Sequence, residues 1–506
     1  MEYWSKQYVK GDGFVNIGID LGTTFSAVAY VSENGNAQIV TNRDGERTTP
    51  SVVMFEDGAI VVGEQAKENS VINPLDVCQF VKRSMGDKSF SFDVSMTESY
   101  SAEDISAMIL KRLKEDAEQA TGENITGAVI TVPAYFFDEQ RKATQDAGEI
   151  AGLNVLGIIN EPTAAAIAYC HGQANQEGKV LVYDLGGGTF DVTIMDIAND
   201  FSDVKILATS GDRMLGGFNF DNEIMNKVIE DFENQYGIDL SDDDEALQEL
   251  RLKSENLKKA LSARPKASFI ISSEGEKMKV EMTRDEFDEL TKSLVDSTKI
   301  RMEMAMDDAG LKWSDLTKVL LVGGSTRIPA IREMIEELTG IAPSCELNPD
   351  EAVAIGAAYY ANSLTNEESV NIKVIDVNSH SLGIVASGMN DIILERNTPL
   401  PARKSKIFYT SCDNQTELLT QVVEGEDPEL EYDTIVGECL LEIKPHPKGS
   451  EVEVEMSYDK NGMIHVSVRD LSDNCNLGEM EVERKSNLTK EEVKQKKDKL
   501  NKLIID

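Results

Sequence analysis

The sequence of 506 residues predicts an α/β region with an internal duplication, followed by an antiparallel β-sandwich and a short C-terminal helix. Three observations predict this fold class. An apolar strand, Asp-Leu-Gly and a second apolar strand occur near residue 20 and again near residue 184. Short alternating strands begin at about residue 380, and helix-start residues open the segment 487–506. Because one hydrophobic core seldom organises so long a chain, two or more domains are expected.

Composition limits the partners of this chain. The formal net charge of -40 repels nucleic acid and anionic membrane surfaces, so neither is expected as a partner. An anionic ligand therefore needs backbone amides, helix N-termini or a metal ion to hold it. The first twenty residues contain no apolar core of signal-peptide length, and no later stretch reaches transmembrane length. We expect a cytoplasmic protein.

Zinc and imidazole chemistry are not favoured. The six cysteines are scattered without a Cys-x-x-Cys pair, and the four histidines have no ligand spacing to one another. Carboxylates, hydroxyls, lysine and a bound metal ion must then carry any chemistry.

The duplicated motif has two copies that align residue by residue. "VNIGIDLGTTFSAVAYV" carries Asp20 where "KVLVYDLGGGTFDVTIMD" carries Asp184, and the second copy has one extra glycine in its turn. Each copy alone is as well explained by a structural β-hairpin, and the triple glycine alone also fits a linker. Two copies can instead face each other, with tip amides and hydroxyls donating to phosphate and the two carboxylates ordering a hydrated cation.

A second pair of segments supports the duplication. "INEPTAAAIAY" (159–169) and "LNPDEAVAIGAAYY" (347–360) each begin near an Asn, place Pro at a predicted helix start and continue with small residues. Small residues let two helices approach closely, although ordinary core helices would look similar.

A third glycine element, "KVLLVGGSTRIPAIREMIEEL" (318–338), reads as strand, tight turn and amphipathic helix, with Pro329 in the first helical turn. Its exposed backbone could approach a flat ring or a ribose, with Arg327 stacking on the ring. The sequence contains neither a Walker A loop nor the G-x-G-x-x-G spacing of a Rossmann turn.

Four segments together resemble the signatures of the seventy-kilodalton heat-shock chaperones, the DnaK-like proteins of the actin and sugar-kinase superfamily. They are "IGIDLGTTFSAVAY", "VPAYFFDEQRKATQDAGEIAGLNVLGIINEPTAAAIAY", "DLGGGTFDVTI" and "VGGSTRIP". The resemblance implies an actin-like, two-lobed ATPase domain with a duplicated ribonuclease-H-like core. It also implies ATP or ADP with Mg²⁺ in the cleft, and allows K⁺. The segments "VKRSMGD", "YFFDEQRK" and "SYDKNGMIHVSV" look closest to the short HscC-type branch.

By this resemblance, site residues can be carried over one position at a time. The two phosphate hairpins would contribute Gly22, Thr23, Thr24 and Phe25, and Gly186, Gly187, Gly188 and Thr189. Hydrated Mg²⁺ would be held by Asp20, Glu161 and Asp184, with Asp191 nearby, and Lys82 would lie near the γ-phosphate and the attacking water. The adenosine pocket would comprise Glu255, Lys258, Lys259, Ser262, Gly323, Gly324, Ser325, Arg327 and Asp350. Taken singly, each of these residues also fits an ordinary structural role, such as a solvated ion pair or a strand-end cap.

The C-terminal third is predicted to be the β-sandwich. Residues 450–471 alternate, turn at Asn461-Gly462 and alternate again, which indicates a hairpin, and further strands are expected at 391–396, 406–411, 415–424 and 437–443. In the family this sandwich holds an extended apolar peptide. The matching positions are Leu382, Ile384, Phe408, Leu418 and Met463, each equally consistent with plain sandwich core. Ser387 replaces the groove methionine that the family pattern expects.

The expected domains are 1–368 for the ATPase, 369–376 for the linker, 377–485 for the sandwich and 486–506 for a short lid helix. Coupling between them is assigned by resemblance to Pro133, Arg141, Ile372, Val374, Ile375 and Asp376, with Arg141 also the position for a J-domain co-chaperone. The family usually has leucines where Lys373 stands, two acidic residues where Phe218 and Asn219 stand, and often Arg where Lys259 stands.

The function expected from these residues is an ATP-dependent chaperone that binds extended client peptides and works with a J-domain protein and an exchange factor. Two alternatives remain. A phosphotransferase on the same core would use a cleft carboxylate as base but leaves the sandwich without a purpose. A regulator or exchange factor that hydrolyses ATP weakly would be consistent with the altered linker.

Overall fold

The computed structural model describes residues 14–56, 58–95, 98–171, 177–198, 203–344, 348–366, 373–458, 464–481 and 488–505. Several sequence expectations fall outside these residues: the coupling residue Ile372, the groove residue Met463, the Asn461-Gly462 turn, and the domain boundaries at 368/369 and 485/486. Among the helices described, none is both long and apolar enough to cross a membrane.

Lobe I is built on the sheet β11-β10-β1-β2-β3. Its strands are β1 (Phe14–Asp20), β2 (Phe25–Val31), β3 (Ala37–Ile39), β10 (Asn124–Val132) and β11 (Asn154–Asn160), with β4 (Thr49–Pro50) also paired to β2. Helices α2 (Ala102–Thr121) and α3 (Asp138–Ile150) pack on it. Smaller elements complete the lobe: α1 (Glu64–Asn69), β5 (Val52–Glu56), β6 (Ala59–Val62), β7 (Val77–Gln79), β8 (Phe92–Ser95) and β9 (Glu98–Tyr100).

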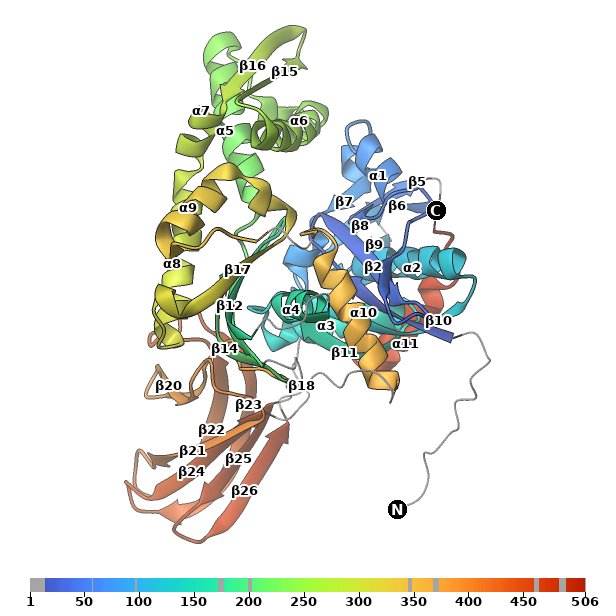
Figure 1. The fold of residues 1–506 in the computed structure, drawn as a ribbon. Coiled ribbons are helices and arrows are strands. Elements are labelled where there is room, and N and C mark those ends of the chain that lie inside the picture. Colours follow the sequence, from blue (N-terminus) through green and yellow to red (C-terminus); the bar gives the residue numbers. More distant parts are fainter. Residues whose placement is uncertain are drawn as a thin grey trace.

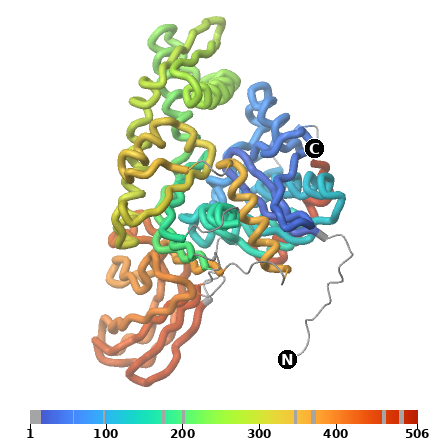
Figure 2. The backbone as a smooth tube through the Cα atoms, viewed as in Figure 1, coloured from blue at the N-terminus to red at the C-terminus, as the bar shows by residue number. Residues whose placement is uncertain are grey.

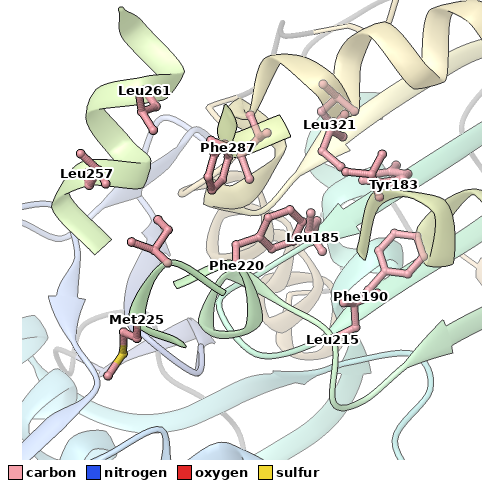
Figure 3. Packing of buried hydrophobic residues seen from close by; sticks show 14 of the residues in the cluster. Tyr183, Leu185, Phe190, Leu215, Phe220, Met225, Leu257, Leu261, Phe287 and Leu321 are labelled. Atoms are coloured by element: carbon pink, nitrogen blue, oxygen red, sulfur yellow. The ribbon is translucent and has the colours of Figure 1, made fainter. Parts of the chain in front are cut away.

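Lobe II is built on the sheet β17-β12-β13-β14-β18. Its strands are β12 (Gly178–Leu185), β13 (Phe190–Ile197), β14 (Asp203–Asp212), β17 (Leu316–Val322) and β18 (Lys373–Ile375). It also contains α5 (Gly217–Tyr236), α6 (Asp244–Ala263), α7 (Arg284–Leu290), α8 (Lys292–Asp308), α9 (Pro329–Thr339) and the hairpin β15 (Lys266–Ser273)–β16 (Glu276–Thr283). Figure 3 shows Tyr183, Phe190, Phe220 and Phe287 in its core, all fully buried or nearly so.

The two lobes repeat one local topology. In lobe I, β1 pairs antiparallel with β2 and parallel with β10. In lobe II, β12 pairs antiparallel with β13 and parallel with β17. Both aspartates stand near the end of the first hairpin strand, as the sequence alignment predicts.

Two helices rich in small residues, α4 (Glu161–His171) and α10 (Ala352–Thr365), pack together where the lobes meet. A Cβ on Gly356 would lie 1.7 Å from the Ala164 carbonyl oxygen, so this crossing requires glycine. One detail of the predicted helix starts is wrong. Pro162 is the second residue of α4, but α10 begins at Ala352, and Pro349 lies in the preceding turn, where its carbonyl accepts a hydrogen bond from Gly323 N at 3.2 Å.

The C-terminal third forms two four-stranded antiparallel sheets, β20-β19-β22-β23 and β21-β24-β25-β26. The strands are β19 (Leu382–Ala386), β20 (Met389–Leu394), β21 (Ala402–Tyr409), β22 (Gln415–Glu424), β23 (Thr434–His446), β24 (Glu451–Tyr458), β25 (Ile464–Asp470) and β26 (Cys475–Glu481). Their inward side chains share one core, so the predicted sandwich is present. The predicted strand 415–424 matches β22, 391–396 is shifted by two residues from β20, and β21 and β23 are longer than predicted. The strands β19 and β26 were not predicted.

The sandwich and the last helix lie on different lobes (Figures 1 and 2). β18 adds to the edge of the lobe II sheet beside β14, and Arg396 pairs with Asp308 of α8 at 2.9 Å. The helix α11 (Lys490–Leu500) instead lies on α3 of lobe I, and its Lys496 pairs with Asp104 of the neighbouring helix α2 at 2.5 Å. The sequence offers Asn487 or Thr489 as the cap of this helix. Asn487 lies outside the described residues, and the hydroxyl of Thr489 accepts from Glu492 N at 3.3 Å.

Candidate functional site

A cleft of about 360 Å³ lies between the two hairpin tips and extends to α6 and the Gly323 turn. Most of the carried-over site residues line it. Those from the hairpins and the phosphate end are Asp20, Gly22, Thr23, Thr24, Phe25, Lys82, Glu161, Asp184, Gly186, Gly187 and Thr189. Those from the opposite end are Glu255, Lys258, Lys259, Ser262, Gly323, Gly324, Ser325, Arg327 and Asp350. Gly188 and Asp191 do not line it; both are buried, and Asp191 pairs with Asp184 across the second hairpin.

The two hairpin tips are in contact. A Cβ placed on Gly187 would lie 2.3 Å from Thr24 Oγ1, and one on Gly188 would lie 2.5 Å from Thr23 Cγ2. The threonines of the first tip therefore occupy the space that the glycines of the second leave open. The result is a narrow cradle of glycine backbone and threonine side chains, the type of surface that binds phosphate.

Four carboxylates gather beside the tips. Asp20 ends β1, Asp184 and Asp191 lie one residue inside the ends of β12 and β13 that meet at the hairpin tip, and Glu161 is the first residue of α4. Burial, and then the charge of Glu161, raise the pKa of Asp20 and of Asp191 to about 7. The same causes raise the pKa of Asp184 well above its ordinary value, with further contributions from Asp191 and Asp20.

Lys82 is the cation placed within this cluster. It belongs to the 3-10 turn Val81–Ser84, is buried, and its Nζ lies 2.5 Å from Glu161 Oε1. One ammonium against four carboxylates leaves an excess of negative charge. That excess suits a divalent cation with oxygen ligands, so the residues present fit Mg²⁺.

The opposite end of the cleft is organised by ion pairs. Lys258 Nζ lies 2.8 Å from Asp221 and donates to the Gly217 carbonyl at 2.9 Å. Arg327 makes a two-pronged pair with Asp350 at 2.9 and 2.8 Å. This pair fixes the orientation of the Arg327 guanidinium, the group that is expected to stack on a flat ring.

A bridge between the lobes closes over this end. Lys67 of α1 pairs with Glu255 of α6 at 2.7 Å, and Lys259 pairs with the same carboxylate at 2.6 Å. Burial acts to raise the pKa of Glu255, but the two lysines outweigh it and lower that pKa to about 2. Both ammonium groups also lie within 5.1 Å of the Phe25 ring centroid.

Sequence reasoning missed several residues of the cleft. No sequence pattern around Lys67 indicates a role in the cleft, because its partner Glu255 is far away in the sequence. Asp221 lies in "LGGFNFD", and its approach to Lys258 follows from the packing of α5 against α6. Thr48, Gly217, Pro349 and Val353 also line the cleft and were not assigned.

Comparison with known proteins decides the family. The family model described as Hsp70 protein matches residues 16–504. The chain belongs to the Hsp70 family. It is 45% identical over 470 residues to the chaperone protein DnaK of Thermotoga neapolitana, of Thermotoga petrophila and of Thermotoga maritima. Each alignment covers 90% of this chain and 78% of the relative.

Membership in the Hsp70 family makes this chain an ATPase and an ATP-dependent chaperone, as the sequence analysis predicted. Neither the phosphotransferase nor the weakly hydrolysing regulator is favoured. Hsp70 proteins bind ATP or ADP with Mg²⁺, and bind unfolded client peptides and co-chaperones.

Two of the residues to which the resemblance assigns coupling, Arg141 and Asp376, are joined through Asn160. Arg141 donates to Asn160 Oδ1 at 2.5 Å and to the Ala134 carbonyl at 3.2 Å, and Asn160 Nδ2 donates to Asp376 at 2.8 Å. Burial raises the pKa of Asp376, and Arg141 opposes that shift. Pro133 is also buried, just before the Ala134 carbonyl that accepts from Arg141. Val374 and Ile375 pair with β14 in the strand β18.

The carried-over peptide positions differ in exposure. Leu382 and Ile384 are buried in the sandwich core, with Leu382 fully enclosed. Phe408 and Leu418 are only partly buried and pack against the edge of that core. Phe408 and Leu418 therefore have the surface that a peptide contact needs, whereas Leu382 does not have it in this conformation.

Proposed function

We propose that the cleft binds ATP or ADP between the two hairpin tips, with hydrated Mg²⁺ held by Asp20, Glu161 and Asp184 and with Asp191 behind them. The observation that carries this assignment is the pair of opposed tips beside four carboxylates and one buried lysine. The surrounding carbonyl and carboxylate oxygens also suit K⁺. The adenosine would lie toward α6 and the Gly323 turn.

The roles of the chain's own groups follow from this placement. Tip amides of Gly187 and Gly188 would donate to phosphate oxygens, whereas Gly186 N already donates to the Thr189 carbonyl at 3.1 Å. Lys82 adds positive charge where negative charge develops. Glu161 holds the Lys82 ammonium in position through their short hydrogen bond. Mg²⁺, when bound, would neutralise charge on the phosphates. Positioning then supplies most of the catalysis, and no strong base is required.

Single-turnover hydrolysis of ATP is the test. Lys82→Ala is expected to slow hydrolysis while ATP still binds, because one charge-stabilising donor is lost. Lys227→Ala is the matched control, since that lysine forms an exposed pair with Asp231 on α5. Equal rates for wild type and Lys82→Ala would contradict the assignment. Repeating the assay with a J-domain protein and with peptide tests whether both stimulate turnover.

We further propose the domain boundaries 1–368, 369–376, 377–485 and 486–506, with an actin-like ATPase core and a sandwich that binds extended apolar peptide. Phe408 and Leu418 are the described residues best suited to contact that peptide, and Leu382 and Ile384 would support them from within the core. Phe408→Ala should weaken binding of a fluorescent apolar peptide without changing ATP affinity. Unchanged peptide affinity in this variant would show that Phe408 does not contact the peptide.

Communication between the domains is assigned to Arg141, Asn160 and Asp376, with β18 as the connecting strand. The working partners would be a J-domain protein acting near Arg141 and a nucleotide exchange factor, in the cytoplasm. The HscC-type branch remains a proposal supported by the three quoted segments. Asp376→Asn keeps the shape of the side chain but removes its charge, and peptide stimulation of ATP hydrolysis should then fall. Full stimulation in this variant would contradict the assignment.

A further inference from the structure

Four side chains form a cluster that joins the two lobes next to the cleft, and we call it the aromatic clasp: Phe80 and Arg83 of lobe I, and Phe218 and Arg251 of lobe II. The rings of Phe80 and Phe218 meet edge to face with centroids 4.8 Å apart. Arg83 lies 4.5 Å from the Phe218 ring centroid, and Arg251 lies 5.0 Å from it and 5.6 Å from that of Phe80. None of the four is among the residues that line the cleft.

The backbone at Phe80 is strained. Its φ of 59° and ψ of 21° lie in the left-handed region, which a bulky residue rarely adopts. Such a conformation persists only where surrounding contacts impose it, and it often marks a functional position. Here the surrounding contacts are those with Phe218 and Arg251.

On the lobe I side, the clasp is continuous with the Lys82 turn. Phe80 immediately precedes the turn Val81–Ser84, which carries both Lys82 and Arg83. Lys82 extends inward to Glu161, whereas Arg83 extends outward to Phe218 and donates to the Met214 carbonyl at 3.0 Å. One short turn thus contacts both the cleft and the opposite lobe.

On the lobe II side, the clasp is tied to the triple-glycine hairpin. Phe218 N donates to the Gly187 carbonyl at 2.7 Å, and Gly217 N donates to the Gly186 carbonyl at 2.9 Å. A shift of Phe218 would therefore be transmitted directly to the hairpin tip. Arg83 and Arg251 are both half-buried, and this burial lowers the pKa of each guanidinium.

We infer that the aromatic clasp is a latch that positions the Lys82 turn against the triple-glycine hairpin and slows the opening of the cleft and the release of nucleotide. The inference rests on the proposed nucleotide site. The latch differs from the Lys67–Glu255 bridge, because ring contacts are screened far less by salt than an ion pair is. Phe80 and Phe218 are positioning residues, since neither lines the cleft.

Release of fluorescent N-methylanthraniloyl-ADP, chased with unlabelled ADP in the presence of Mg²⁺, tests the latch in the full chain. Phe218→Ala and Phe80→Ala should each release the probe about threefold to tenfold faster, the range that the loss of one aromatic pair implies. The double variant should release it no faster than the faster single variant, because both substitutions break the same contact. Phe218→Tyr should restore the wild-type rate.

Phe269→Ala is the control, because Phe269 is a partly buried aromatic of β15 that packs within lobe II. Its release rate should match wild type, and all variants should unfold at temperatures close to wild type. Unchanged release in both clasp variants, additive effects in the double variant, or equal acceleration by Phe269→Ala would overturn the latch. Failure of the wild type to bind the probe would instead overturn the nucleotide site on which the latch depends.

Discussion

The hairpins β1–β2 and β12–β13 share their strand pairing and their aspartates, yet their tips have diverged in opposite directions. The first tip carries Thr23 and Thr24, and the second carries the triple glycine. Because Thr24 faces Gly187 and Thr23 faces Gly188, the bulk added to one copy is matched by bulk absent from the other. The comparison teaches that two copies of one motif can become complementary halves of a single site.

The largest expected effect comes from adding one methyl group to the smaller tip. Gly187→Ala would place its Cβ within 2.3 Å of Thr24, so the tips must separate. A displacement of about 1 Å at a phosphate site costs about a hundredfold in rate, and we expect a loss of that size in single-turnover ATP hydrolysis.

Gly186→Ala provides the matched comparison at the same tip. A Cβ there meets only Thr189 O at 3.7 Å and Thr189 Oγ1 at 4.0 Å, which are ordinary contacts. Its thermal stability should match that of wild type, whereas Gly187→Ala should unfold at a lower temperature. Equal stability of the two variants would mean that complementarity of the tips is unimportant.

The second effect concerns the paired aspartates. We assume that Asp20 and Asp184 act through water on the same Mg²⁺. Asp20→Asn and Asp184→Asn should then each raise the Mg²⁺ concentration needed for half-maximal hydrolysis about tenfold to a hundredfold, as losses of outer ligands do. Titrating Mg²⁺ in each variant measures this. A strong effect at only one aspartate would show that the duplication is not functionally symmetric.

The third effect is a dependence of stability on pH in the metal-free protein. The pKa of Asp20 is raised to about 7, so its contribution to stability is complete below pH 4 and is lost as the pH rises from 4 to 7. Without metal, Asp20→Asn should therefore match wild type near pH 4 and exceed it by on the order of 1–2 kcal/mol at pH 8. Urea unfolding at both pH values, with exposed Asp93→Asn as control, checks the prediction. The same advantage at pH 4 would contradict it.

The smallest expected effect separates packing from hydrogen bonding at the larger tip. Thr23→Val keeps the branched shape that faces Gly188 but removes the hydroxyl. Because the tip amides remain, hydrolysis should fall by only about threefold, the loss of roughly one modest hydrogen bond. A loss as large as that of Gly187→Ala would indicate that the hydroxyl, rather than the fit between the tips, is the main contribution of this residue.

Much of the fold and cleft could be predicted from sequence because the signals are local. Asp20 and Asp184 follow apolar strands, and glycines mark the turns after them. The Lys67–Glu255 bridge could not be predicted, since two charged residues on separate helices meet only after the lobes pack. The left-handed backbone of Phe80 could not be predicted either, because phenylalanine rarely adopts that conformation. Pro349 was misplaced because proline suits both a helix start and the turn before one.

The pairing of β18 with β14 also protects the protein from unwanted association. β14 is bonded to β13 on one side, and residues 203–205 bond to residues 373–375 on the other. Without β18, that edge would present unpaired amides and carbonyls, which are a template for strands of other molecules. Exposed Asp203 and Lys205 flank the buried Val204 there, and charges at a sheet edge discourage such pairing. The strand β18 therefore covers an edge that would otherwise favour association between molecules, and the charged side chains of Asp203 and Lys205 oppose pairing there.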